Sequence, residues 1–229
     1  MNNLIGIIGA MDIEIEGILA SMTDVSSQKI SQVTFYKGKI SDKSVVVAKC
    51  GIGKVFAAMC AQAMILNYNP SVIINTGVAG TLSKQLGILD VAVAKSVVQH
   101  DMDTSAIGDP VGLISGINVV DIFADDCVVN ALKTACDKLN YRHQEGTIAS
   151  GDKFISDNLD KERIKNTFGA IACEMEGAAI GQVCYVNGVK FGVLRAISDG
   201  EGAEMDYSTF APLAAKHSIE IIKKFIEIY

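Results

Sequence analysis

The sequence predicts a single-domain α/β fold with a mixed β-sheet. The chain has 229 residues, of which 49% are hydrophobic, and no linker-like composition divides it. This length is sufficient for one sizeable core, so we expect one domain over residues 1–229. Short apolar runs typical of buried strands alternate with segments whose apolar residues recur at helical spacing. Two strands separated by a short polar turn favour an antiparallel pair, which makes the sheet mixed.

The first half of the chain begins with a strand, a tight turn and a helix. Residues 4–9 form a short apolar run, and Asp12 then opens a helix whose apolar positions continue to Met22. The polar turn at residues 41–43 separates the two strands that we expect to pair antiparallel. The later elements of this half are strands 33–37 and 44–50, a helix over 55–66 and a buried strand over 71–76.

The second half continues the alternation and contains one long loop. The segment from Asp101 to Gly116 carries several glycines and a proline, and loops of this length in a compact domain tend to be lids or interface segments. The predicted elements of this half are strand 90–98, helix 124–139, strand 146–150, a polar surface helix 157–168, helix 175–186, strand 191–197 and a long amphipathic C-terminal helix.

Composition excludes several classes of function. The formal net charge is −6, the pI is near 5.1 and only three arginines occur, which argues against binding to nucleic acid or to anionic membranes. The six cysteines show no CxxC spacing, so we expect small core residues in a reducing cytoplasm, with no disulfide framework and no metal site. No targeting segment and no apolar run of roughly 20 residues is present, which indicates a soluble cytoplasmic protein.

Glycine-containing turns follow several predicted strands. Residues 6–11 do not fit the GxGxxG pattern of dinucleotide-binding folds. Residues 50–54 lack the span and the hydroxyl residue of a phosphate-binding P-loop. The glycines at 77 and 80 have two interpretations: an ordinary strand exit with positive φ, or a place where a ligand approaches the backbone.

Two carboxylates, Glu174 and Glu176, interrupt the otherwise apolar stretch 170–179. Charged groups taken out of water need a specific partner. One explanation is structural: acids in the first turn of a helix complement the positive end of the helix dipole. The functional explanation is that a carboxylate at the end of a strand accepts hydrogen bonds from the vicinal hydroxyls of a sugar.

Acidic residues near the ends of distant strands, together with one arginine, predict a shared pocket. Glu14, Glu174, Glu176 and Asp199 lie at or just beyond predicted strands, and Arg195 lies within the last strand. Open α/β sheets place their ligands at the carboxyl ends of strands. Such a pocket suits hydrolysis through a cationic transition state, in which one carboxylate activates water, another holds hydroxyls and a third protonates the leaving group.

Five motifs, which follow one another along essentially the whole chain, carry a resemblance to a known family. They are Gly6-Ile7-Ile8-Gly9-Ala10-Met11 with Glu14, Asn75-Thr76-Gly77-Val78-Ala79-Gly80, Ser150-Gly151-Asp152, Glu174-Met175-Glu176 and Arg195-Ala196-Ile197-Ser198-Asp199. Together they resemble the 5'-methylthioadenosine/S-adenosylhomocysteine nucleosidases. The resemblance implies a nucleoside-phosphorylase-like three-layer α/β/α sandwich, usually a homodimer, that cleaves an N-glycosidic bond with water. It implies no metal and no organic cofactor.

The resemblance also assigns the reacting groups. Glu14 is expected to position and deprotonate the attacking water. Asp199 is expected to deliver a proton to adenine N7, so that adenine departs neutral. Glu176 is expected to hold the ribose hydroxyls, assisted by the backbone of Met175 and by Arg195.

Further positions follow from the same resemblance. Phe154 is expected to stack on the base, the main chain of Ile155 to contact its Watson–Crick edge, and Ser198 to orient Asp199. Although Phe154 and Ile155 are equally compatible with plain core positions, the resemblance places them at the base. The apolar walls around ribose and the 5'-thio group are expected to come from Met11, Met175 and Tyr207.

The remaining positions have looser assignments. Many relatives carry a hydroxyl residue where Val78 stands, so any contact with water there must come from its backbone. Glu174 is expected to support the site from behind. Ile52 and the loop around Ile107 are expected to reach the pocket of a neighbouring subunit.

Three other functions are compatible with parts of this pattern. A nucleoside phosphorylase would use phosphate in place of water, yet Asp12, Glu14 and Glu16 at the first loop would repel a phosphate dianion. Futalosine and 5'-deoxyadenosine are alternative substrates for the same hydrolysis. A non-catalytic nucleoside-binding protein would not need both Glu14 and Asp199 beside the group that holds the hydroxyls.

Overall fold

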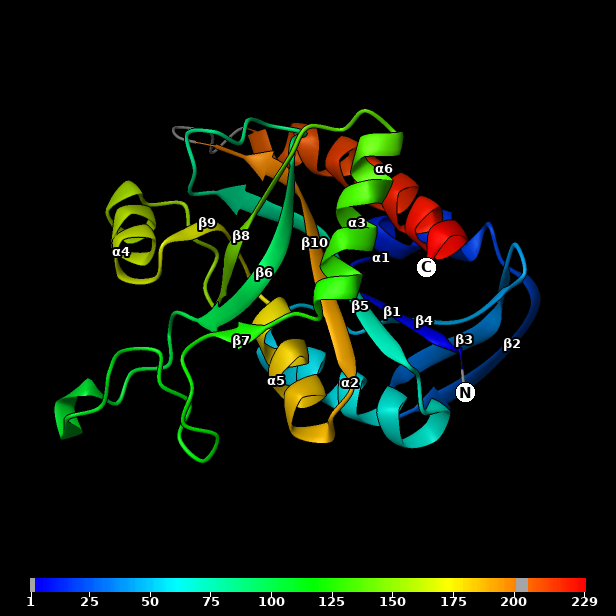
Figure 1. Cartoon of the computed structure of the whole chain (residues 1–229), viewed down its shortest axis with the longest axis horizontal. Coiled ribbons are helices and arrows are strands. Elements are labelled where there is room, and N and C mark those ends of the chain that lie inside the picture. Colours follow the sequence, from blue (N-terminus) through cyan, green and yellow to red (C-terminus); the bar gives the residue numbers. More distant parts are fainter. Residues whose placement is uncertain (1–2, 201–205) are drawn as a thin grey trace.

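A computed structural model describes residues 3–200 and 206–229 (Figure 1). Within these residues one mixed sheet of ten strands forms the centre of the molecule. The strands are β1 Ile5–Gly9, β2 Thr23–Ile30, β3 Val33–Ile40, β4 Lys43–Lys49, β5 Val72–Thr81, β6 Val91–Gln99, β7 Ile122–Phe123, β8 His143–Ser150, β9 Ala170–Glu174 and β10 Lys190–Asp199. The helices are α1 Asp12–Leu19, α2 Lys54–Tyr68, the short 3-10 helix η1 Ser105–Ile107, α3 Asp126–Lys138, α4 Asn158–Phe168, α5 Gly177–Asn187 and α6 Asp206–Ile228.

The sheet combines parallel and antiparallel pairs, as the sequence predicts. Strand β1 lies between β4 and β5 and is parallel to both, whereas β3 is antiparallel to β2 and β4. Strand β10 pairs with both β5 and β6, so that β5, β10, β6, β8 and β9 close into a ring. This closure brings the ends of β9 and β10 beside the end of β5, where the site is built.

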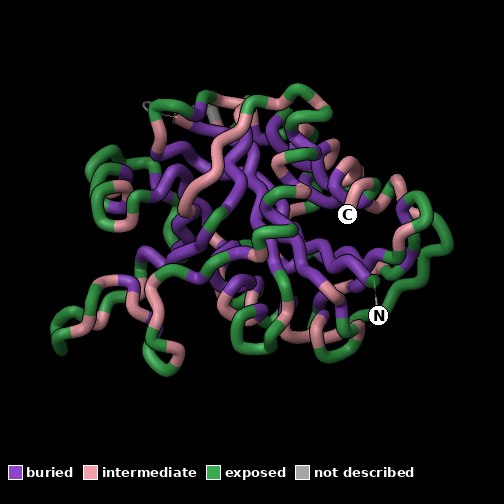
Figure 2. Tube along the Cα trace, in the orientation of Figure 1, coloured by how far each residue is buried: buried purple, intermediate pink, exposed green. Residues whose placement is uncertain are grey.

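Helices cover both faces of the sheet, which confirms the layered architecture. Helix α6 packs against α1 and α3 on one face, and α2 packs against α5 on the other (Figure 1). The strands between these layers are buried (Figure 2), and every residue of β5 is buried. A strand covered on both faces has an almost continuously apolar sequence, which is the pattern that predicted it.

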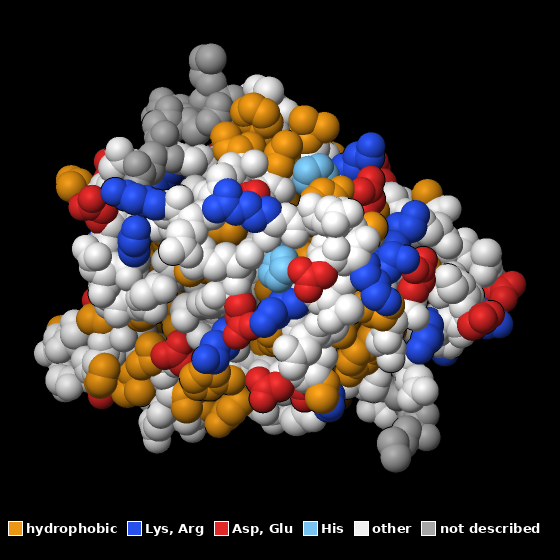
Figure 3. Space-filling model, turned by 45° about the horizontal axis from the view of Figure 1, so that its top comes forward, with side chains coloured by type: hydrophobic (Ala, Val, Ile, Leu, Met, Phe, Trp, Pro, Cys, Tyr) orange, Lys and Arg blue, Asp and Glu red, His pale blue; other side chains and the backbone are white. Residues whose placement is uncertain are grey.

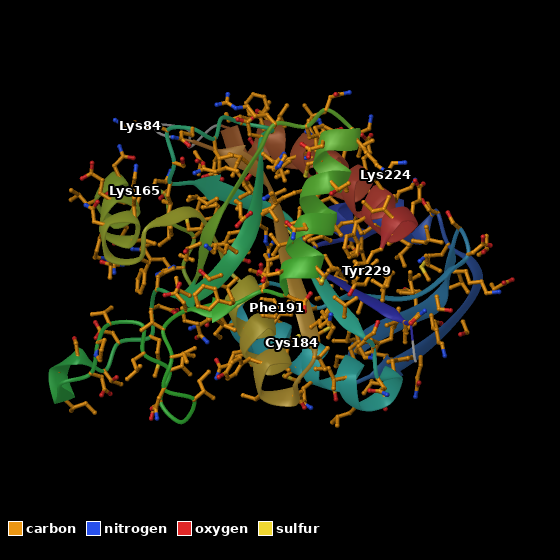
Figure 4. All side chains as sticks on the ribbon, viewed as in Figure 1. Lys84, Lys165, Cys184, Phe191, Lys224 and Tyr229 are labelled. Carbon is orange, nitrogen blue, oxygen red and sulfur yellow. The ribbon has the colours of Figure 1, made fainter. Side chains whose placement is uncertain are left out.

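Small residues allow the helices to lie close to the sheet. Phe191 on β10 and Cys184 on α5 lie where α5 covers the strands (Figure 4). A side chain at Gly181 would come within 3.0 Å of the Phe191 ring, so glycine permits this close packing. All six cysteines are free and five are buried, which confirms the prediction of small core residues except at the exposed Cys127.

The structure corrects three expectations about local structure. Helix α1 ends at Leu19 and not at Met22, whose N–H closes a turn onto the Leu19 carbonyl at 3.1 Å. The next segment forms β2, a polar strand that is exposed along nearly its whole length and therefore lacks the apolar pattern that would predict it. Helix α4 is not only a surface helix, because it buries Lys161 and Ile164.

The surface carries charges of both signs. On the face shown in Figure 3, basic and acidic side chains lie interspersed, and neither sign forms a continuous patch. The phosphate backbone of a nucleic acid requires an extended basic surface, and this face does not offer one. In the described part of the chain, no helix has the combination of length and apolar content needed to cross a bilayer.

Candidate active site

A cavity of about 240 Å³ lies at the carboxyl ends of β1, β5, β9 and β10. It brings together the predicted site residues with one exception: Ile107 is 82% exposed on η1 and does not line the cavity. The predicted residues in the lining are Met11, Glu14, Ile52, Val78, Phe154, Ile155, Glu174, Met175, Glu176, Arg195, Ser198, Asp199 and Tyr207. The lining residues that were not predicted are Ala10, Ala79, Gly80, Lys153 and Cys173.

Glu14 points into the cavity from the first turn of α1. Its Oε2 accepts hydrogen bonds from the backbone N–H groups of Ala10 at 2.7 Å and Met11 at 2.9 Å, and its Oε1 accepts from Val78 N–H at 3.2 Å. Burial raises the pKa of Glu14, while the Arg195 charge and the three N–H groups act in the opposite direction. The carboxylate is therefore fixed in position and is a stronger base than an exposed glutamate.

Close approach, more than backbone conformation, explains the glycines at the end of β5. Arg195 pairs in register with Gly77, and a side chain at Gly77 would collide with both Arg195 and Glu14. Asp199 pairs with Gly80, where a Cβ would lie 2.7 Å from Asp199 Oδ2. Of the two interpretations of these glycines, the structure supports the one in which functional groups lie directly over the backbone.

Arg195 is fully buried within β10 and holds the acidic groups together. Its Nη2 donates hydrogen bonds to Asn75 Oδ1 and to the Glu174 carboxylate, and it lies 3.4 Å from Glu176 Oε2. The side chains of the arginine and of both glutamates are at most 5% exposed. One guanidinium thus provides the positive charge that lets carboxylates share a low-dielectric cavity.

Glu174 uses its oxygens to hold neighbouring groups. Besides Arg195, it accepts hydrogen bonds from the Ser150 hydroxyl and from the backbone N–H groups of Glu176 and Gly177. These N–H groups lie at the start of α5, so the explanation from the helix terminus is correct for Glu174. Glu174 also lines the cavity, and its supporting role stays a prediction.

Glu176, unlike Glu174, does not bind the N–H groups at the start of α5. It occupies the N-cap position of α5 but makes no side-chain capping hydrogen bond. Its Oε1 instead accepts from the backbone N–H of Gly53 at 2.9 Å, and the side chain lines the cavity. Burial raises the pKa of Glu176 to about 7; the Arg195 charge opposes this rise and the Glu174 charge adds to it. Glu176 is available to a ligand with hydroxyl groups.

Asp199 is the last residue of β10. Strand β5 pairs with β10 on one side and on the other with β9, the strand that ends at Glu174. Asp199 is 4% exposed, and its Oδ1 accepts a hydrogen bond from the Ser198 hydroxyl at 3.0 Å. The predicted contact between Ser198 and Asp199 is therefore present. Lys161 belongs to the helix predicted as a polar surface helix, yet its Nζ lies 3.9 Å from Asp199 Oδ2. Helical spacing does not predict that Lys161 is buried, because a single inward-facing lysine leaves the polar pattern of α4 unchanged.

Aromatic and aliphatic side chains form the mouth and walls of the cavity. The Phe154 and Tyr207 rings meet edge to face with centroids 5.5 Å apart, and the Tyr207 hydroxyl lies 3.5 Å from Met11 Sδ. Phe154 is 53% exposed at the mouth and Ile155 is buried. An exposed phenyl ring beside a cavity provides a flat apolar surface on which a planar base can stack.

The arrangement places the carboxyl groups of Glu14, Glu176 and Asp199 and an apolar wall within one small cavity. This set suits the cleavage of a bond between a sugar and a planar heterocycle. Among residues 3–200 and 206–229, no three His, Cys, Asp or Glu side chains form a cluster suited to a metal ion.

Comparison with known proteins identifies the family. Residues 4–227 match the model of the Phosphorylase superfamily. A 5'-methylthioadenosine/S-adenosylhomocysteine nucleosidase of Staphylococcus haemolyticus is 38% identical over 228 residues, which cover 98% of this chain and 100% of that protein.

Solved structures of similar proteins support the same family. The nucleosidase of the same name from Neisseria meningitidis, in complex with methylthio-immucillin-A, matches with a TM-score of 0.95 at 31% identity and covers 99% of this chain and 100% of that chain. A futalosine hydrolase of Helicobacter pylori matches with a TM-score of 0.95 at 36% identity and covers 100% and 99%. The chain belongs to the phosphorylase superfamily and, within it, to the 5'-methylthioadenosine/S-adenosylhomocysteine nucleosidase family of N-glycosyl hydrolases.

Proposed function

We propose that the protein hydrolyses the N-glycosidic bond of 5'-methylthioadenosine and S-adenosylhomocysteine, and also that of 5'-deoxyadenosine, releasing adenine and the 5-substituted ribose. The observation that carries this proposal is that Glu14 and Asp199, distant in sequence, line one cavity together with Glu176. The names of the relatives supply the substrate class.

Glu14 is the group that activates water. A carboxylate whose pKa is raised by burial takes a proton from water more readily than an exposed one. Its three backbone hydrogen bonds and the nearby Arg195 hold it in one orientation, so the water is presented to the anomeric carbon without loss of side-chain entropy in the reaction step.

Asp199 is the acid for the leaving group. It gives its proton to N7 of adenine as the bond between C1' and N9 breaks, so that the purine leaves as a neutral molecule. The positive charge that develops on the ribose ring is stabilised by the carboxylates of Glu14 and Glu176. Phe154 stacks on the base, and the main chain of Ile155 contacts its Watson–Crick edge.

The sugar and its 5' substituent occupy the other part of the cavity. Glu176 accepts hydrogen bonds from the ribose hydroxyls, with the backbone of Met175 and Arg195 beside it. Met11 and Tyr207, whose side chains touch, contribute the apolar wall for the 5'-thio group. Neither a metal ion nor an organic cofactor has a step in this reaction.

Water, not phosphate, is the proposed nucleophile. Arg195, the cavity's guanidinium, already contacts Glu174 and Glu176, and helix α1 contributes Glu14, so a phosphate dianion would meet mainly negative charge. The test is adenine release from 5'-methylthioadenosine by the purified protein with and without phosphate. Equal rates, with 5-methylthioribose as the second product, support hydrolysis. Phosphate-dependent formation of a ribose 1-phosphate contradicts it.

Futalosine is a second candidate substrate, because the similar Helicobacter pylori structure is described as a futalosine hydrolase. The same assay with futalosine, 5'-deoxyadenosine, 5'-methylthioadenosine and S-adenosylhomocysteine ranks the four by kcat/KM. A kcat/KM for futalosine far above those of the other three would make futalosine the principal substrate.

We also propose that the protein is a homodimer. Helix α2 exposes Val55, Phe56 and Met59 next to Ile52, which lies at the cavity mouth, and apolar side chains grouped in this way favour a protein contact. Sedimentation is expected to give twice the chain mass of 24.3 kDa, and Phe56→Asp is expected to shift the protein toward the monomer. A monomeric wild-type protein with full activity contradicts the dimer and the cross-subunit roles expected for Ile52 and Ile107.

A further inference from the structure

Lys161 is a buried cation that faces the site from a helix whose other charged residues are largely exposed. Its Nζ donates a hydrogen bond to the carbonyl oxygen of Gly200 at 3.0 Å and lies 3.9 Å from Asp199 Oδ2. The side chains of Lys161 and Asp199 are 9% and 6% exposed. The lysine therefore contacts both the proposed acid and the backbone that follows it.

A buried ammonium group is costly unless an anion or several acceptors stand beside it. Among the described residues, Asp199 is the carboxylate within 4.0 Å of Lys161. When Asp199 is ionised, the two charges attract strongly at this separation, because burial removes most of the screening by water. A lysine that served only to fill space would be replaced at lower cost by an apolar residue, so this contact calls for a role at Asp199.

The two oxygens of Asp199 have different partners. Oδ1 accepts from the Ser198 hydroxyl at 3.0 Å, whereas Oδ2 lies near Lys161 Nζ. The missing side chain of Gly80 leaves the space that Oδ2 occupies. Two fixed contacts and one close backbone approach define the orientation of a carboxyl group that would otherwise rotate.

We propose that Lys161 is a positioning residue for the leaving-group acid: it fixes Asp199 and the end of β10, and stabilises the carboxylate that remains after proton delivery. This inference rests on the proposed function, in which Asp199 protonates the purine. In that step the O–H bond of Asp199 breaks, a bond from N7 to hydrogen forms, and the electron pair of the C1'–N9 bond moves to the purine. The negative charge left on Asp199 then lies beside the Lys161 ammonium.

The proposal predicts an effect that depends on the leaving group. Adenine needs a proton to depart neutral, whereas 4-nitrophenolate leaves as a stable anion without one. A residue that acts through the acid matters for the first leaving group and little for the second. A residue that only supports the fold affects both equally.

The experiment compares Lys161→Met with wild type on 5'-methylthioadenosine and on 4-nitrophenyl 5-methylthio-β-D-ribofuranoside. We expect kcat on the nucleoside to fall by about tenfold or more with KM nearly unchanged, and kcat on the nitrophenyl glycoside to stay within about twofold. Lys161→Arg should recover much of the nucleoside activity, because it keeps the charge. Lys165→Met, one turn further along α4 (Figure 4), is the matched control and should retain wild-type kinetics on both substrates.

Equal losses on both substrates, or no loss on the nucleoside, overturn the proposal. If Lys161→Met does not fold, Lys161→Gln, which keeps a donor for the Gly200 carbonyl but no charge, takes its place with the same expected selectivity. Asp199→Asn distinguishes a failure of the acid role of Asp199 from a failure of the positioning role of Lys161. Should it retain nucleoside turnover, the acid assignment fails and the role of Lys161 fails with it; should it lose turnover while Lys161→Met does not, only the role of Lys161 is wrong.

The double variant gives an independent check. If Lys161 acts through Asp199, adding Lys161→Met to Asp199→Asn should lower nucleoside turnover no further. Additive losses would mean that the two residues act separately, which contradicts the proposal.

Discussion

Arg195 and Glu174 form an ion pair in which the arginine side chain is 1% exposed and the glutamate side chain 2%. The same guanidinium nitrogen also faces Glu176, and the Arg195 charge acts on Glu14. One cation therefore compensates carboxylates that would repel one another in a cavity with little water. The site depends on this pair before any substrate binds.

Removing the cation should destabilise the fold. Arg195→Met leaves Glu174 buried without its charged partner, and breaking a buried ion pair in this way costs about 3–5 kcal/mol. Urea unfolding at pH 7.5 measures the loss. Arg142→Met, at a side chain that is 71% exposed, is the control and should change the free energy of unfolding by less than about 0.5 kcal/mol. A change at Arg195 as small as that of the control would show that the pair contributes little.

Ligand binding should depend on the protonation of Glu176. Because its pKa is raised to about 7, it is ionised above that pH and protonated below it, and only the ionised form accepts hydrogen bonds at both oxygens without donating one. The affinity for a non-hydrolysable nucleoside analogue should therefore weaken as the pH falls through about 7. Calorimetric titration between pH 5.5 and 8.5 measures this affinity.

The matching variant is Glu176→Gln. It should bind the analogue more weakly at pH 8 and should lack the change near pH 7, because the group that titrates has been removed. Persistence of the same pH dependence in the variant would assign it to another residue.

A single methyl group at Gly80 should displace the acid. A Cβ there would lie 2.7 Å from Asp199 Oδ2, so Gly80→Ala is expected to lower nucleoside turnover at least tenfold and to cost about 1–3 kcal/mol of stability. Gly87→Ala is the control, because a Cβ at Gly87 meets only Asp90 at an ordinary 3.6 Å. Wild-type turnover in Gly80→Ala would mean that Asp199 moves without consequence.

The sequence predicted those parts of the fold whose burial leaves a pattern. Strands covered on both faces, such as β5, have continuous apolar sequences, and the long apolar periodicity of α6 identifies it as a helix. The resemblance to the family predicts the site residues, and all of them except Ile107 line the cavity.

The features that the sequence does not predict have no such pattern. Strand β2 is polar and exposed, and it is held by pairing with β3 instead of by burial. The pairing of β10 with both β5 and β6 is a property of the assembled sheet and has no local sequence signal. Lys161 is one inward-facing lysine in a helix of polar composition, so only the folded structure reveals its partner.

The burial of Glu14 lowers the stability of the fold at neutral pH. Its folded pKa is raised above the ordinary value of 4.5, so folding favours the protonated form, and this carboxylate lowers stability increasingly as the pH rises above 4.5. Glu14→Gln removes the charge, but its NH2 group cannot accept a hydrogen bond, so the backbone contacts of one oxygen are lost. The two effects oppose each other, and the variant should therefore stay folded at pH 7.5 with an unfolding temperature close to that of the wild type.

The most direct test of the account is the turnover of 5'-methylthioadenosine by this folded Glu14→Gln variant, followed as adenine release at pH 7.5. If Glu14 activates the water, kcat should fall by about 100-fold or more, since general-base catalysis contributes roughly 10²–10⁴-fold. Near-wild-type turnover in a folded variant would show that Glu14 does not activate the water.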